Sequence, residues 1–265
     1  MSHEDEQLLA LALEVAREGG ALVERMRREG VSVADTKSSQ VDIVTAADRA
    51  CEDLVRARVL AARPDDGVVG EEGDDVRGSS GVRWVVDPID GTVNYLYGLP
   101  HWAVSVAAAR GDEVVAGVVL APALGVTYTA VRGGGAFRDG SPLQVREPVE
   151  VAQSLVATGF SYSPEVRARQ GRAVARLLAR VRDVRRMGSC ALDLCGVAEG
   201  SLDGYVEEGP HWWDHAAGAL VAQEAGAVVE VTRGPALDLV RAAPRGAWDQ
   251  FAALVEECGF LEAST

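Results

Sequence analysis

Residues 83–100 read RWVVDPIDGTVNYLYGLP, and this stretch decides how the rest of the chain is interpreted. Its first five residues, RWVVD, predict a buried strand because three of them are large and apolar. Pro88 forces an extended conformation on the residue before it, so Asp87 should still lie on the strand end while Asp90 sits on the following loop. Both carboxylates can then face one point at the C-terminal end of a strand, where binding crevices commonly form.

Two carboxylates at this spacing indicate a cation site. Acids this close repel each other, which raises at least one pKa unless a cation neutralises the pair. Hard oxygen ligands select Mg²⁺, Mn²⁺ or Ca²⁺ rather than zinc. The amides of Gly91 and Thr92 could bind phosphate if a helix begins there. The alternative is an Asx-type turn in which the acids cap loop amides, and the motif alone leaves both open.

Segments on both sides of this motif give the chain a family resemblance. The matching stretches are WVVDPIDGTVNYLYGLP at 84–100, Gly70-Glu71-Glu72 upstream, Trp213-Asp214-His215-Ala216-Ala217-Gly218 downstream, and the segments KSS at 37–39 and DIVTAAD at 42–48. Together they resemble the signatures of the inositol monophosphatase family, from about Lys37 to Gly226. The resemblance implies a layered αβαβα sandwich, of mixed α+β and α/β class, of the inositol monophosphatase and sugar phosphatase type.

Carried over position by position, the resemblance implies three groups of site residues. The metal ligands are Glu71, Asp87, Ile89 through its carbonyl, Asp90 and Asp214; the catalytic residues are Glu71, Thr92 and Asp48; the substrate-binding residues are Asp90, Gly91, Thr92, Ala191 and Glu207. Thr92 and Asp48 match the pair that orients the attacking water. Glu207 matches the position that accepts a hydrogen bond from a hydroxyl of inositol, whose burial unpaired would cost affinity.

The implied reaction is the Mg²⁺-dependent hydrolysis of a phosphate monoester by in-line attack of metal-activated water. Roughly two to three Mg²⁺ ions per active site are expected, with Mn²⁺ as a substitute, because a two-metal clamp can stabilise both the attacking and the leaving oxygen. The favoured substrate is myo-inositol 1-phosphate. Histidinol phosphate or another sugar or polyol phosphate is the alternative, since Glu207 would suit an ammonium group equally well. The resemblance also implies lithium sensitivity and a homodimer.

Several of these residues have a plainer interpretation. Asp48 has capping-box spacing from Thr45, and Asp214 fits the N-cap of a helix. Glu207 could end a strand in solvent. His211 and His215 lie four apart, but Pro210 and the missing HExxH glutamate disfavour a zinc site.

Other groups with a plainer interpretation are cysteines and arginines. Cys190 and Cys195 are expected as core residues. The pair Arg185 and Arg186 is the basic dipeptide nearest to a motif, and an exposed or interface role suits it at least as well.

Composition restricts the partners. The net charge of −14 over 265 residues disfavours nucleic acids and membrane surfaces, which are themselves polyanionic. Four scattered cysteines and the lack of an opening signal segment predict a cytoplasmic protein, and no apolar run reaches the length of a membrane span. A second function class remains open, because some members of the family are known to bind transcription machinery.

Apolar periodicity divides the chain into two halves. Residues 1–147 are predicted as an α+β half with an antiparallel sheet that carries most metal ligands, and 148–265 as an α/β half packed against it. The first half should contain helices at 7–28, loosened at Gly19-Gly20, and from Thr45 to Pro64, then strands at 102–110, 113–122 and 125–131. The second should contain strands at 154–160, 202–208 and 227–232 and helices at 167–181, 189–199 and 214–225.

Overall fold

The strand that carries the acidic motif, β4 (Val82–Asp90), belongs to a seven-stranded sheet. β3 (Gly67–Gly70) pairs with it in parallel and β5 (Ala103–Arg110) antiparallel. The chain then continues as an antiparallel meander through β6 (Glu113–Ala121), β7 (Val126–Val131), β8 (Gly135–Arg138) and β9 (Ser141–Pro142), with the 3-10 turn η1 (Pro122–Leu124) between β6 and β7. The predicted meander is confirmed, and β4 extends beyond its predicted end at Asp87 to Asp90.

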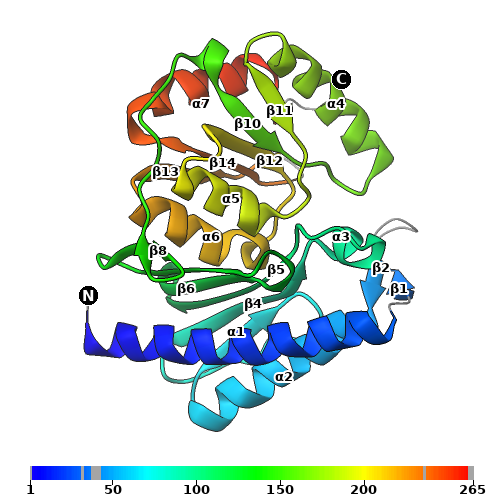
Figure 1. The fold of residues 1–265 in the computed structure, drawn as a ribbon, viewed down its shortest axis with the longest axis vertical. Helices are drawn as coiled ribbons and strands as arrows, with labels where there is room; N and C mark the ends of the chain where they lie inside the picture. The colour runs from blue at the N-terminus through cyan, green and yellow to red at the C-terminus, as the bar shows by residue number, and fades with distance from the viewer. Residues whose placement is uncertain (1, 31–32, 37–42, 235–236, 262–265) are drawn as a thin grey trace.

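Two helices cover one face of this sheet. α1 (His3–Glu29) and α2 (Ala46–Ala62) bury Leu8, Val55 and other side chains against Trp84 and Val104 of the strands. The small ribbon of β1 (Val33–Thr36) and β2 (Ile43–Thr45) lies beyond the end of α1 (Figure 1). The structure describes residues 2–30, 33–36, 43–234 and 237–261, so the matching residues at 37–39 and Asp42 lie outside it.

The helix α1 corrects one prediction. It runs unbroken for 27 residues, so the expected loosening at Gly19-Gly20 is wrong. A Cβ on Gly19 would lie 2.9 Å from Cys51 Sγ, and one on Gly20 would lie 2.6 Å from Leu120 Cδ2. The two glycines therefore allow α1 to approach α2 and the sheet closely, at the cost in helix propensity that glycine carries.

A second sheet is built from the later part of the chain. Its strand order is β11 (Asp183–Arg185), β10 (Leu155–Thr158), β12 (Gly204–Glu208), β14 (Leu239–Pro244) and β13 (Ala227–Thr232). β10 runs parallel to both of its neighbours, whereas β14 runs antiparallel to both of its own. The 3-10 turns η2 (Val151–Gln153) and η3 (Arg245–Ala247) precede β10 and follow β14.

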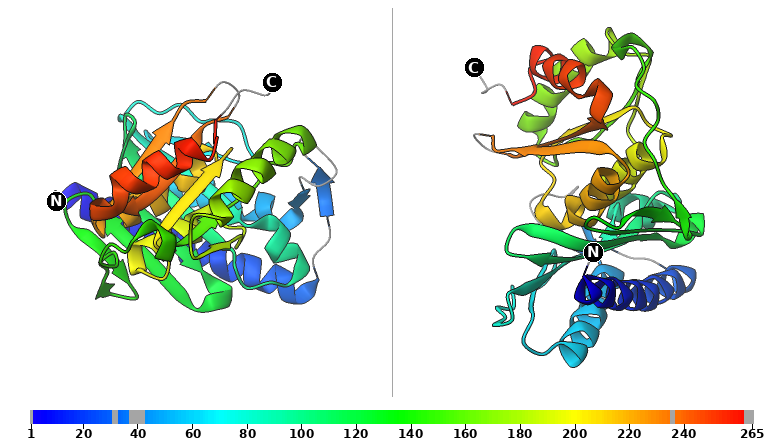
Figure 2. Two further views of the ribbon diagram at one scale, coloured as in Figure 1. Left: turned by 90° about the horizontal axis from the view of Figure 1, so that it is seen from above. Right: turned by 90° about the vertical axis from the view of Figure 1, so that its left-hand side faces the viewer.

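Four helices complete the layers (Figures 1 and 2). α5 (Cys190–Glu199) and α6 (Trp212–Glu224) lie between the two sheets, and they share a core with residues of both, including Ala107 of β5 and Val240 of β14. α4 (Pro164–Leu178) and α7 (Trp248–Glu257) cover the outer face of the second sheet. The predicted αβαβα sandwich is confirmed. The boundary between 147 and 148 stays a prediction.

The helices described here include none that combines the length and the apolar character of a membrane span. α1 has the length, but acidic and basic residues occupy its first and last turns. All four cysteines are buried and free, as expected for core residues.

Candidate active site

One pocket of about 480 Å³ gathers most of the predicted residues. Its wall includes Glu71, Asp87, Ile89, Asp90, Gly91, Thr92, Glu207 and Asp214. These residues come from the β3–β4 loop, the end of β4, the start of α3 (Thr92–Tyr97), β12 and the start of α6. Both sheets and the helical layer between them therefore contribute to a single pocket.

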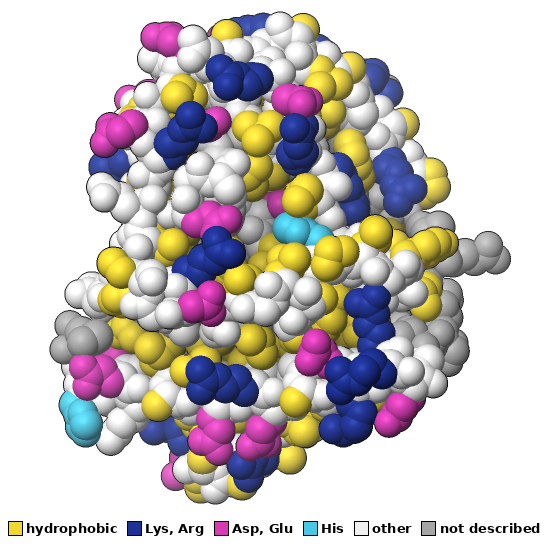
Figure 3. All heavy atoms as spheres, in the orientation of Figure 1, with side chains coloured by type: hydrophobic (Ala, Val, Ile, Leu, Met, Phe, Trp, Pro, Cys, Tyr) yellow, Lys and Arg dark blue, Asp and Glu magenta, His cyan; other side chains and the backbone are white. Residues whose placement is uncertain are grey.

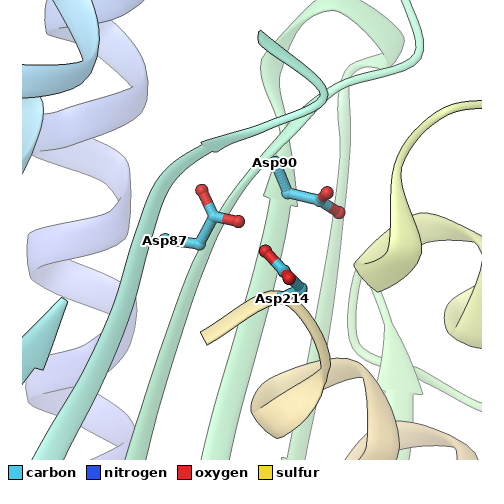
Figure 4. Close-up of side chains that lie close together, drawn as sticks. All are labelled: Asp87, Asp90 and Asp214. Atoms are coloured by element: carbon cyan, nitrogen blue, oxygen red, sulfur yellow. The ribbon is translucent and has the colours of Figure 1, made fainter. Parts of the chain in front are cut away.

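Asp87, Asp90 and Asp214 form the acidic centre of the pocket. A carboxylate oxygen from each of the three lies within 4.8 Å of the others, and Figure 4 shows the three side chains close together, from the end of β4 and the start of α6. Burial raises the pKa of Asp87 and of Asp214 well above the usual range, and the charge of Glu71 raises both further. Three acids at this separation, two of them buried and Asp214 half-buried, fit a cation, which would replace the lost hydration of the carboxylates.

Asp87 also makes the local turn that the motif left open. Its Oδ1 accepts a hydrogen bond of 3.0 Å from the amide of Ile89, which is an Asx-type turn across Pro88. A carboxylate oxygen has two lone pairs, so this turn and a cation contact are compatible. The turn fixes the side chain on the pocket side of β4.

Asp90 is held by the N-terminus of α5. Its Oδ2 accepts from Ser189 Oγ at 2.5 Å and from the amide of Ala191 at 2.7 Å, and its Oδ1 accepts from the amide of Cys190 at 3.2 Å. Burial raises the pKa of Asp90 to about 7, although these hydrogen bonds act in the opposite direction. The bonds connect β4 to a helix about one hundred residues later in the chain, so the carboxylate cannot turn freely.

Asp214 reaches the centre from α6. The helix begins at Trp212, with His211 as its N-cap, so the interpretation of Asp214 as an N-cap is wrong. Asp214 is the third helical residue, and its carboxylate accepts from the amide of His211 at 2.5 Å as in a capping box. The side chain therefore supports the start of α6 and faces the two strand acids from the same position.

Thr92 lines the pocket, whereas Asp48 is buried behind Thr92's hydrogen bond and is not part of the pocket wall. Thr92 Oγ1 donates to Asp48 Oδ1 at 3.2 Å or to the carbonyl of Ile89 at 3.1 Å, since a hydroxyl has one hydrogen to give. The predicted capping box between Thr45 and Asp48 is confirmed, with Thr45 donating to Asp48 Oδ2 through its amide and its hydroxyl. Burial raises the pKa of Asp48 to about 6, with a contribution from the charge of Glu71.

Glu207 of β12 lines the same pocket. Its carboxylate accepts a 2.8 Å hydrogen bond from the hydroxyl of Tyr205, and burial raises its pKa to about 7. It therefore lines the pocket and does not end a strand in open solvent. Ala191 is fully buried and its amide donates to Asp90, whereas its neighbour Cys190 lines the pocket.

Arg186 is a pocket residue that the sequence did not identify. It lines the same pocket as Glu207. Burial raises the pKa of Glu207 and of Asp193, and the positive charge of Arg186 opposes both shifts. Its guanidinium lies against Gly188, where a Cβ would be 2.4 Å from Nη1. The only available signal was the position of the basic pair shortly before α5, which begins at Cys190, and this position gives no direction for either side chain.

The two histidines of the zinc alternative face different spaces. His211 lines the acidic pocket, whereas His215 lines a separate cavity of about 690 Å³. Burial lowers the pKa of His215 to about 4. Within the described ranges, the acidic cluster able to hold a metal consists of aspartates alone, which suits a hard cation.

Comparison with known proteins agrees with this geometry. The model of the inositol monophosphatase family matches residues 4–258. An inositol-1-monophosphatase named SuhB from Mycobacterium tuberculosis is 42% identical, with 98% of this chain and 97% of the relative covered. A protein of Haemophilus influenzae named Nus factor SuhB is 37% identical, with 84% of each chain covered.

Solved structures give the same result. Mycobacterium tuberculosis SuhB superposes with a TM-score of 0.85 at 40% identity, covering 98% of this chain and all of that one. An inositol monophosphatase from Anabaena superposes with a TM-score of 0.83 at 28% identity, covering 95% and 96%. Shared sequence over nearly the whole length, a shared sandwich and an acidic pocket where its layers meet lead to one conclusion: this chain belongs to the inositol monophosphatase family.

Proposed function

We propose that the chain is a Mg²⁺-dependent phosphomonoesterase that hydrolyses myo-inositol 1-phosphate to myo-inositol and phosphate. The observation that carries the proposal is one pocket that is lined both by a cluster of three aspartates and by Glu207. The first feature suits a cation with a phosphate, and the second suits an alcohol with hydroxyl groups to donate.

The metal ligands would be Glu71, Asp87, Asp90, Asp214 and the carbonyl of Ile89. When bound, Mg²⁺ supplies charge stabilisation to the phosphate oxygens and to the leaving oxygen. Glu71 supports this assignment because it lines the pocket and its charge acts on both Asp87 and Asp214. The hydrogen bonds from α5 to Asp90 keep that carboxylate fixed, as such supporting bonds do in metal sites.

Thr92 and Asp48 would orient the attacking water. Asp48 is fixed by Thr45, so its other oxygen can accept the hydroxyl hydrogen of Thr92. The Thr92 oxygen can then accept a hydrogen bond from a water molecule and direct its lone pair at the phosphorus. The raised pKa of Asp48, about 6, still leaves it ionised at neutral pH and able to receive a proton.

The test of this function is activity with and without metal. Asp90→Asn and Asp214→Asn should lower kcat for inositol 1-phosphate by on the order of 10³-fold, because each removes a charge from the centre. Asp183→Asn, which changes an exposed acid paired with Arg185, is the matched control. Phosphate release by the wild type should stop in excess chelator and return with Mg²⁺ or Mn²⁺. Full turnover in chelator would refute the proposal.

Arg186 favours a neutral polyol over a cationic alcohol. Glu208 is already paired with Arg169, and the central acids would be neutralised by metal, so the charges left facing the alcohol are those of Glu207 and Arg186. A carboxylate and a guanidinium together can accept from and donate to neighbouring hydroxyls, whereas the guanidinium repels the ammonium of histidinol phosphate.

Substrate preference should therefore respond to this residue. Arg186→Glu should lower the ratio of kcat/KM for inositol 1-phosphate to that for histidinol phosphate by about tenfold, equivalent to roughly 1.4 kcal/mol. The same ratio in Arg186→Gln should lie between the values for Arg186→Glu and the wild type. Arg185→Gln on the exposed strand β11 is the control. An unchanged ratio in Arg186→Glu would contradict this role.

A second function, as an interaction protein, comes from the relative named Nus factor SuhB. The complete set of acids in the pocket is not needed for such a role, so hydrolysis remains the first proposal. A pull-down of transcription proteins with Asp214→Asn as bait would separate the two functions, since binding would survive the loss of hydrolysis.

A homodimer in the cytoplasm and sensitivity to lithium complete the proposal, and these expectations rest on the resemblance to the family. Light scattering coupled to size-exclusion chromatography measures the oligomeric state. Loss of phosphate release on titration with Li⁺ measures the sensitivity to lithium.

A further inference from the structure

The loop that carries Glu71 has little regular structure of its own. It leaves β3 at Gly70 and enters β4 at Val82. An isolated bridge between Val68 and Val76 closes its base, and its last residues are held by the amides of Ser79 and Ser80, which donate to the carbonyl of Asp65. The amide of each of these valines donates to the carbonyl of the other, at 2.9 and 2.8 Å. The part of the loop that bears Glu71 therefore depends on contacts from other elements for its position.

Glu52 of α2 provides the first of these contacts. Its side chain is almost completely buried, and its carboxylate accepts from the amide of Glu72 at 2.8 Å and from the amide of Gly73 at 2.9 Å. These are the two residues that follow Glu71. A Cβ on Gly70 would lie 2.6 Å from the same carboxylate, so the glycine before Glu71 is fitted to it as well.

Arg56 fixes the carboxylate and the loop from the next turn of α2. Its Nε donates to Glu52 Oε1 at 2.7 Å, its Nη1 to the carbonyl of Asp74 at 2.8 Å and its Nη2 to the carbonyl of Gly73 at 3.1 Å. Glu52 and Arg56 thus bind amides and carbonyls of the same short segment. A charged pair with these charge-assisted bonds ties the backbone of this segment to α2.

We propose that Glu52, fixed by Arg56, is a positioning residue that sets the place of Glu71 at the metal centre. The inference rests on the proposed function, since it takes Glu71 to be a metal ligand. Asp48 lies one turn before Glu52 on α2, so one helix fixes both the residue bonded to Thr92 and the loop of Glu71. Loss of the Glu52 contacts frees the loop without touching the bonds of Asp48.

The test measures metal binding without turnover. Glu52→Gln keeps the size of the side chain but removes the charge and one of the acceptors. In a calorimetric titration of the substrate-free protein, its Mg²⁺ affinity should fall by about 10-fold or more, as for other supporting residues of metal sites. Saturating Mg²⁺ should restore kcat, and KM for the substrate should stay near the wild-type value.

A matched variant separates positioning from general stability. Glu18→Gln, on α1, removes an ion-pair partner of Arg58, which lies on another face of α2. This variant should leave Mg²⁺ affinity unchanged. Folded Glu52→Gln with wild-type affinity would overturn the inference. Should Glu52→Gln not fold, Arg56→Gln carries the same test, with the same expected loss and the same contrary result. Absence of Mg²⁺ binding by the wild type would instead refute the proposed function.

Discussion

Asp90 belongs to two structures at once. As the last residue of β4 it faces Asp87 and Asp214, and as the acceptor for Ser189, Cys190 and Ala191 it binds the start of α5. Two amides and a hydroxyl stabilise a negative charge that burial alone would remove at neutral pH. The residue can therefore hold a cation and also join the two sheets through α5.

Thr92 gives a prediction at the same scale. Thr92→Val keeps the shape of the side chain but removes the hydroxyl that donates to Asp48. We expect kcat for phosphate release to fall by about 10²-fold or more, with little change in KM. Thr92→Ser keeps the hydroxyl and should retain most of the activity. Equal rates for the valine and serine variants would show that the hydroxyl has no part in the reaction.

Residues whose geometry is set locally could be predicted from the sequence. Pro88 placed Asp87 on the strand, although Asp90 also lies on β4 and not on the loop that was predicted, and the spacing of Thr45 and Asp48 gave a capping box that is confirmed. Arg186 could not be predicted because its place depends on how β11 meets the pocket. The family match assigned the substrate contact to Ala191, whereas in the structure Cys190 faces the pocket; which of them touches substrate stays a prediction.

At the scale of elements, the junction of β4 with α3 depends on Gly91. This residue has φ of +101°, a conformation that side chains with a Cβ adopt only at a cost. A Cβ there would also lie 3.0 Å from the carbonyl oxygens of Gly188 and His101. The tight junction brings the start of α3, with Thr92, next to the acids of β4.

Gly91→Ala should therefore destabilise the protein and impair the site together. We expect the free energy of unfolding in urea to fall by about 2–4 kcal/mol, from backbone strain and the two close oxygens. Gly111→Ala is the matched control, because Gly111 has φ of +61° but no atom near the position of a Cβ. In Gly111→Ala the free energy of unfolding should fall by about 1–2 kcal/mol, which is the cost of the left-handed backbone conformation alone. Equal losses in both variants would contradict the packing argument.

Most of the long periodic elements were predicted, with β14 as an exception, and most of the short ones were not, although β10 was. The meander and the helices α1, α2, α5 and α6 follow clear apolar patterns, whereas β3, β8, β9 and β11 have four residues or fewer and depend on neighbouring strands for their hydrogen bonds. The helix α7 was also missed, although Phe251, Leu254 and Val255 give it an apolar face that packs on the second sheet. A helical pattern was present there but was not recognised.

The whole molecule concentrates buried acids at one point. Its net charge is −14, yet on the face in Figure 3 basic and acidic side chains are interspersed over the surface. The acids of the centre instead lie inside, between layers from both halves of the chain. Their mutual repulsion opposes folding in the absence of a cation, so metal binding and folding stability should be linked.

Mg²⁺ should therefore raise the melting temperature. At about 100 times its Kd a bound ion contributes about 2.7 kcal/mol, which corresponds to roughly 5–10 °C for a chain of this size. Burial raises the pKa of Asp90 in the folded protein to about 7. Without metal, the contribution of Asp90 to folding stability is therefore fully present below its unfolded pKa and is lost as pH rises through the folded pKa. The increase in melting temperature on addition of Mg²⁺ should therefore be larger at pH 8 than at pH 6. Scanning fluorimetry in Mg²⁺ and in chelator measures it, with Asp214→Asn as the variant that should lack it.

Two helix N-termini meet at the pocket, those of α5 and α6, and this has a consequence for the rate of substrate capture. Each N-terminus carries a partial positive charge, and a field of this kind weakens within about one helical turn. The net negative charge of the molecule acts over a longer range and repels a phosphate ester in dilute buffer. Encounter should therefore quicken as ionic strength rises from a low value, because salt screens the distant repulsion more than the attraction at close range.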